Sequence, residues 1–243
     1  MHILKNFIVF VFIIGNITSI SVAAPPVEPI YFYASQTGKQ TLDQGEGGGN
    51  PFASALVELL ARDTLTFDNF RSELIDLTGK KSRGFQRPEI FSKVDLGSWH
   101  LLPKPSTEKR IALVLVFSDY TISGARALPG AKNDLVRISK SLAEAKFEVQ
   151  TAIDPDQSKL NSILKEFSER SKTSDVAVLY TTGHGVEVNG IIYLLPGDYL
   201  LVYGKSKLNE RAIRLTRIGD AVQASKVNLV FYGGCRNNPF DEP

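Results

Sequence analysis

The chain has 243 residues, of which 43% are apolar and 22% are charged, with a formal net charge of +2. This composition is typical of a globular protein, so a disordered chain is not expected. Because the charge is small and Lys and Arg are scattered without a basic block, no nucleic-acid partner is predicted.

The first 24 residues have the pattern of a signal peptide. Lys5 gives a positive start, residues 7–14 are an unbroken apolar run, and small residues precede Pro25. We therefore expect cleavage near residues 23–24 and an exported protein, periplasmic or secreted. An uncleaved membrane anchor is the alternative, but the apolar run is about half of the roughly twenty residues that a span needs. No other segment approaches that length, so no stable membrane insertion is expected after cleavage.

The next region predicts one strand and one amphipathic helix. Residues 30–34 form a short aromatic-rich run bounded by turn residues, which indicates a buried strand. The glycine-rich residues 45–49 predict a loop. Asn50 as a cap and Pro51 in the first turn favour a helix, whose apolar face repeats at helical spacing through Leu60.

A second helix is expected from near Thr66 to Gly79, where the glycine would end it. Residues 80–93 are polar and are expected to be irregular. Residues 104–109 are polar and proline-bearing, which favours a linker.

The remainder of the chain alternates strands with helices. Strands are predicted at residues 111–117, 147–149, 176–180, 191–195 and 227–232, and helices at 133–145, 157–171 and 215–224. All three predicted helices are long enough to connect two parallel strands. The alternation implies an α/β fold with a mostly parallel sheet covered on both faces.

Two predicted strands end in reactive residues flanked by glycine. The strand at 176–180 leads into His184, and the strand at 227–232 leads into Cys235, the only cysteine of the chain. A cysteine nucleophile needs a nearby base such as imidazole, and the glycines leave main-chain N–H groups accessible to an oxyanion. Taken alone, each residue could be structural, but adjacent parallel strands would bring the two together.

Residues 110–240 carry five motifs that occur in a fixed order. They are Arg110-Ile-Ala-Leu-Val-Leu-Val with Tyr120 soon after, Leu128-Pro-Gly-Ala-Lys-Asn133-Asp134, Leu179-Tyr-Thr-Thr-Gly183-His184-Gly185, Tyr193-Leu-Leu-Pro-Gly-Asp198 and Cys235-Arg-Asn-Asn-Pro-Phe240. Together they resemble the large-subunit region of the caspase and metacaspase superfamily, especially its bacterial secreted members. His184 precedes Cys235 by 51 residues, which agrees with the caspase spacing of about fifty.

The resemblance implies a three-layer α/β/α sandwich and a cysteine-type endopeptidase that acts on peptides or proteins through a thioester. It implies Cys235 as the nucleophile, His184 as the general base and acid, and the N–H groups of Gly185 and Cys235 as the oxyanion hole. No cofactor is expected. The histidines and acidic residues show no metal-ligand spacing and no EF-hand loop, so neither a metal site nor calcium dependence is predicted.

Residues 25–103 resemble the small-subunit segment that normally follows the catalytic cysteine. The matching motifs are Tyr33-Ala-Ser-Gln-Thr-Gly38, Asp43-Gln-Gly-Glu-Gly47, Asn50-Pro-Phe-Ala-Ser-Ala-Leu56 and Gly97-Ser-Trp-His-Leu101. We therefore expect one circularly permuted caspase-like domain. It comprises a small-subunit-like segment at 25–103, the linker at 104–109 and the large-subunit-like catalytic segment at 110–243.

The predicted substrate pocket departs from the family pattern. Metacaspase-like proteins usually carry an acidic residue two positions before the nucleophile, but this chain has Gly233, which removes one charge-assisted partner for a basic side chain. Asp134 is the remaining acidic candidate, and an ordinary helix N-cap is its alternative role. A preference for aspartate would need arginines such as Arg126 or Arg236, although Arg236 is expected to be a structural ion-pair partner.

A catalytically silent caspase-like module that binds a peptide or protein partner is the competing interpretation. The Gly233 departure and the few residues after Cys235 favour it, whereas the retained histidine and cysteine favour the peptidase. Caspase folds often leave an unpaired sheet edge, so a homodimer is also compatible with the sequence.

Overall fold

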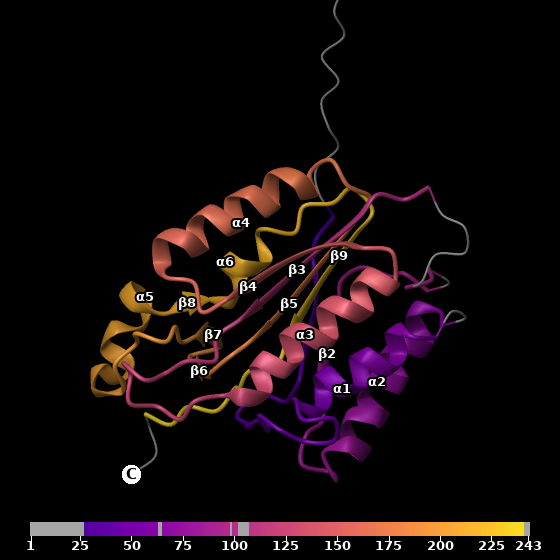
Figure 1. Cartoon of the computed structure of the whole chain (residues 1–243). Helices are drawn as coiled ribbons and strands as arrows, with labels where there is room; N and C mark the ends of the chain where they lie inside the picture. Colours follow the sequence, from indigo (N-terminus) through magenta and orange to yellow (C-terminus); the bar gives the residue numbers. More distant parts are fainter. Residues whose placement is uncertain (1–26, 63–64, 98, 102–106, 241–243) are drawn as a thin grey trace, which may run out of the picture.

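The computed structural model describes residues 27–62, 65–97, 99–101 and 107–240 (Figure 1). The predicted signal peptide, residues 1–24, lies outside these ranges, as do residues 104–106 of the predicted linker. Within the described ranges, no helix has both the length and the apolar character needed to cross a membrane.

A six-stranded sheet forms the centre of the molecule, with the strand order β2-β1-β9-β5-β3-β4. Every neighbouring pair is parallel except β1 with the edge strand β2. The strands are β1 (Ile30–Tyr33), β2 (Glu89–Phe91), β3 (Arg110–Val116), β4 (Glu148–Ile153), β5 (Val176–Thr182) and β9 (Val227–Tyr232). Because β1 pairs with β9, the first and last strands of the chain are neighbours in space.

Helices cover both faces of this sheet (Figure 1). On one face lie α1 (Pro51–Leu60), α2 (Phe67–Lys81) and α3 (Pro129–Glu144), and on the other lie α4 (Gln157–Ser171) and α6 (Leu215–Gly219). In β3, alternate residues pack toward opposite faces: Val114 belongs to the core under α1 to α3, and Leu113 to the core under α4 and α6. The predicted three-layer α/β/α sandwich is confirmed.

A small second sheet begins directly after His184. It contains β6 (Gly185–Val188), β7 (Ile191–Leu194) and β8 (Ile213–Arg214), in that order. A 3₁₀ segment, η1 (Leu201–Lys207), and the short helix α5 (Leu208–Arg211) connect β7 to β8. The N–H of Leu195 donates to the carbonyl of His184 at 2.8 Å, so this sheet fixes the main chain next to the histidine.

The predicted end of the second helix is wrong. The helix α2 continues through Gly79 to Lys81. The chain turns only at Arg83 and Gly84, which both have positive φ, and the N–H of Gly84 donates to Gly79 O. The expectation that residues 80–93 are irregular is also wrong in part, because they contain β2, whose three residues are too few to give a periodic pattern.

The predicted start of the third helix is also wrong. The helix α3 begins at Pro129, so Asp134 lies inside the helix and its alternative role as an N-cap is excluded. Pro129 suits the first turn because its φ is already helical and no N–H is lost from the ladder. The helix α6 stops at Gly219, five residues before the predicted end at 224.

Candidate active site

His184 and Cys235 line the same cleft. The strands β5 and β9 that lead to them are adjacent and parallel, as predicted, with Thr181 opposite Tyr232 at their carboxyl ends. The cleft has a volume of about 220 Å³. It is lined by Thr41, Leu42, Asp43, Asn50, Arg126, Leu128, Asp134, Thr182, Gly183, His184, Gly233 and Cys235.

The imidazole of His184 is held by a main-chain carbonyl. Its Nε2 lies 2.7 Å from Arg126 O. Because a carbonyl only accepts, Nε2 donates in this contact, which leaves Nδ1 as the nitrogen that can accept a proton. The arrangement can therefore accept a proton at Nδ1 and afterwards return it.

The sulfur of Cys235 contacts the N-terminal part of the chain. The N–H of Thr41 donates to Sγ at 3.3 Å, and the hydroxyl of Thr41 lies 3.5 Å from Sγ and donates to Gly233 O at 3.1 Å. The cysteine is partly exposed. None of the hydrogen bonds among the described residues joins Cys235 to His184.

The two predicted oxyanion-hole residues are neighbours. A Cβ on Gly185 would lie 2.7 Å from the carbonyl oxygen of Cys235 and would collide with the hydroxyl of Tyr232. That hydroxyl donates to Cys235 O at 3.2 Å. Only glycine allows the main chain at position 185 to approach the cysteine this closely.

Gly233 has a structural reason to lack a side chain. A Cβ there would lie 2.8 Å from Oγ1 of Thr182 and 3.1 Å from the hydroxyl of Tyr180. The space beside the Cα atom of Gly233 is thus already taken by two hydroxyl groups. The carbonyl of Gly233 accepts from the side-chain amide of Asn50 at 3.0 Å, which ties it to the N-terminal part of the chain.

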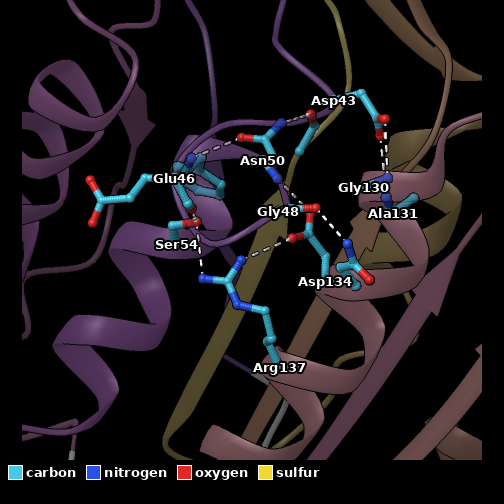
Figure 2. Close-up of polar contacts among 12 residues, drawn as sticks. Asp43, Glu46, Gly48, Asn50, Ser54, Gly130, Ala131, Asp134 and Arg137 are labelled. Carbon is cyan, nitrogen blue, oxygen red and sulfur yellow. Dashed lines mark hydrogen bonds and ion pairs between the residues drawn. The ribbon is translucent and has the colours of Figure 1, made fainter.

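Asp134 is fully buried among the residues that line the cleft. Figure 2 shows its carboxylate beside Asn50 and Arg137. Its Oδ2 accepts from the hydroxyl of Tyr180 at 3.0 Å and from the N–H of Asn50 at 3.3 Å. Its Oδ1 lies 4.0 Å from Nη1 of Arg137 and accepts no hydrogen bond from the described residues. Burial raises the pKa of Asp134 to about 8, and the contacts with Tyr180, Asn50 and Arg137 offset only part of that effect.

Asp43 caps α3 from a distant part of the chain (Figure 2). Its carboxylate accepts from the N–H groups of Gly130 at 3.0 Å and Ala131 at 3.2 Å, and no side chain next to the helix does so. Thr41, Asp43 and Asn50 were not among the site residues predicted from the sequence. Their signal was available, because all three lie in or next to the small-subunit-like motifs.

The two arginines considered for the pocket have different surroundings. Arg236 is buried, with Nη1 2.6 Å from Glu89 and Nε 2.8 Å from Glu187, and its guanidinium lies 4.4 Å from the ring centre of Tyr33. It is therefore the structural ion-pair partner that was predicted. Arg126 is exposed and lines the cleft. Among the residues that the structure describes, no cluster of His, Cys, Asp and Glu is arranged to hold a metal ion.

The sequence comparison agrees with this geometry. The model of the caspase-domain family, Peptidase_C14, matches residues 109–242, which is more than half of the chain and includes both His184 and Cys235. No curated protein matches the chain in sequence. Together with the parallel sheet and its helical layers, the match shows that the chain belongs to the caspase-domain family of cysteine peptidases.

Proposed function

We propose that the protein is an endopeptidase that hydrolyses peptide bonds with Cys235 as nucleophile and His184 as general base and acid. One observation carries the proposal: the carbonyl of Arg126 holds Nε2 of His184, so Nδ1 is the basic nitrogen in a cleft that Cys235 also lines. A base oriented by a third group is the arrangement that activates a nucleophile.

The reaction follows from these roles. His184 accepts the thiol proton, and Sγ of Cys235 bonds to the carbonyl carbon of the substrate. The C–N bond then breaks as His184 gives the proton to the leaving amine, which leaves a thioester. A water molecule, deprotonated by His184, attacks the thioester carbon, and the acid product leaves as the thiol is restored.

The surrounding residues support binding roles. The close main chains of Gly185 and Cys235 suit an oxyanion hole made of their N–H groups. Asp134 and Gly233 are proposed to contact the substrate side chain, because both line the cleft. Since Asp134 is already bonded to Tyr180 and Asn50, we expect weaker selection of basic residues than a pocket with two free carboxylates would give.

The domain organisation is part of this proposal. We infer that residues 25–103 replace the small subunit and precede the catalytic segment at 110–243, with a linker at 104–109, as in a circular permutation. The pairing of β1 with β9 supports this, because it puts the N-terminal segment beside the strand that leads to Cys235. Export with removal of residues 1–24 remains a proposal, and intact mass after expression with secretion would test it.

The deciding experiment combines thiol labelling with substrate profiling. The wild type, His184→Ala and the control His100→Ala are treated with limiting iodoacetamide and assayed on a peptide library by mass spectrometry. We expect fast labelling of Cys235 and cleavage after a defined residue in the wild type and His100→Ala, with both reduced in His184→Ala. Slow labelling in all three proteins with no cleavage would contradict the proposal.

One observation favours the catalytically silent binding module. Thr41 contacts the sulfur with both its N–H and its hydroxyl, a position that an acyl group would need to share. In that case the peptide library would show binding without cleavage. A homodimer through the edge strand β2 stays a prediction, to be checked by the mass in solution.

A further inference from the structure

Besides the contact between its Nε2 and Arg126 O, His184 has a set of contacts with Tyr120, to which the proposed reaction assigns no role. The side chain of Tyr120 is 1% exposed and lies in the connection between β3 and α3. Its hydroxyl accepts the main-chain N–H of His184 at 2.8 Å and donates to Leu195 O at 3.0 Å. Both hydrogen bonds of this phenol are therefore made to the main chain around the histidine.

The ring of Tyr120 also contacts the imidazole directly. The two ring centres are 4.4 Å apart at an interplanar angle of 66°, an edge-to-face contact. On the other side of the same residue, the N–H of Leu195 donates to His184 O at 2.8 Å. The histidine is thus fixed at its N–H, at its carbonyl and at one side of its ring.

The same connection supplies the carbonyl that holds the ring nitrogen. Arg126, six positions after Tyr120, provides the oxygen 2.7 Å from Nε2. The loop between β3 and α3 therefore contacts the histidine at its main-chain N–H, at one side of its ring and at Nε2. The absence of a side chain at Gly183 lets the Tyr120 hydroxyl lie close to the main chain before His184, because a Cβ at position 183 would lie 2.8 Å from that hydroxyl.

Core packing alone does not explain why residue 120 carries a hydroxyl group. A phenylalanine would fill the same space and make the same ring contact, but it would leave Leu195 O and the N–H of His184 without this partner. Burial raises the pKa of Tyr120 above its usual value, so the phenol keeps its proton at neutral pH and can always donate to Leu195 O.

We infer that Tyr120 is a positioning residue for His184: its hydroxyl and ring hold the imidazole so that Nδ1 faces the cleft that Cys235 lines. The inference rests on the proposed function for its catalytic meaning. The positioning itself is a property of the histidine and can be measured without any peptide substrate.

The test compares Tyr120→Phe with the control Tyr199→Phe. Tyr199 is also 1% exposed, and its hydroxyl donates to a main-chain carbonyl, that of Gly204, in another part of the molecule. The rate of Cys235 alkylation by iodoacetamide is measured from acid to alkaline pH, together with kcat and KM for the best peptide. We expect Tyr120→Phe to lower alkylation near pH 7 and kcat by about tenfold, with KM and the alkaline alkylation plateau unchanged.

Tyr199→Phe should reproduce the wild-type pH profile. Equal profiles for all three proteins would overturn the inference while leaving the peptidase intact. Conversely, if no protein cleaves peptides but alkylation still depends on His184 and Tyr120, the positioning stands and the proposed function fails.

A second variant covers the case in which Tyr120→Phe does not fold. Gly183→Ala retains both Tyr120 and His184 but places a methyl group 2.8 Å from the hydroxyl and 3.0 Å from side-chain atoms of Leu194 and Phe117. If positioning depends on that hydroxyl, Gly183→Ala should shift the pH profile of alkylation in the same direction. An unchanged profile in a folded Gly183→Ala protein would count against the inference.

Discussion

The two regions on either side of the undescribed residues 102–106 contribute differently to the cleft. Residues 107–240 hold His184 and Cys235 and include nearly all of the family match. Residues 27–101 hold neither, yet Thr41 contacts the sulfur and Asn50 contacts the carbonyl of Gly233. The proposed catalytic side chains thus come from one region, and the other supplies part of their surroundings.

From this difference we expect substitutions in residues 107–240 to affect the chemical step most, and substitutions in residues 27–101 to affect how the cleft is assembled. The proposed catalytic residues follow β5 and β9, which are adjacent parallel strands of the later region. The earlier region reaches the cleft through hydrogen bonds across more than eighty residues, such as Asp43 with Gly130. Its contributions should therefore be graded, because each depends on one or two hydrogen bonds.

The largest effect should come from the reactive pair itself. His184→Ala removes the proposed base and should lower kcat/KM by about 10² to 10⁴-fold. Thr41→Ala keeps the N–H contact to Sγ and loses only the hydroxyl, so its loss should be about tenfold at most. Kinetics on one peptide substrate compare the two. An equal loss of kcat/KM in both variants would contradict the different roles assigned to the two regions.

A smaller effect is expected at Gly233, where the regions meet. Gly233→Ala places a methyl group 2.8 Å from Thr182 Oγ1, and the overpacking should lower the free energy of unfolding by about 1–3 kcal/mol. Gly79→Ala is the control, because its Cβ would have no neighbour closer than 3.9 Å and would favour α2 by up to about 1 kcal/mol. Urea unfolding measures both, and a Gly233→Ala protein as stable as the wild type would show that Thr182 moves freely.

Asp134 should make stability depend on pH. Its folded-state pKa of about 8 lies above that of an unfolded aspartate, so the folded state binds more protons between these values. Its contribution is full below pH 4, falls as pH rises, and is lost above about pH 8. Asp134→Asn cannot ionise and should flatten this part of the stability curve. The free energy of unfolding of both proteins is measured at several pH values. Parallel curves for the wild type and Asp134→Asn would contradict a raised pKa of Asp134.

The smallest effect concerns two aspartates that cap helices. Asp43→Ala and Asp156→Ala each remove a carboxylate that caps a helix, and each should cost about 1 kcal/mol of stability. Asp156 caps its own helix, α4, whereas Asp43 joins the two regions beside the cleft. Only Asp43→Ala should also raise KM. A KM increase in both variants would indicate a general loosening of the fold.

Elements with a strong local pattern could be predicted from the sequence. The helix at 157–171 has the predicted limits, and the strands predicted from the mainly apolar runs at 111–117 and 227–232 appear as β3 and β9. The start of α3 could not be predicted, because its cap is Asp43, far away in the chain. The edge strand β2 was missed since three residues gain their regular structure from pairing with β1 and not from their own pattern.

The site divides in the same way. The sequence by itself predicted His184 and Cys235 as the catalytic pair, because each follows an apolar strand and stands between glycines or after them. The sequence also determined the α/β class, because segments with strand patterns alternate with segments whose apolar residues recur at helical spacing. Only the tertiary structure decided that Thr41 lies on the sulfur, that Asp134 is buried with Tyr180 and that Tyr120 holds the histidine. These contacts join residues far apart in the chain, and their distances depend on how the layers pack, which no local pattern encodes.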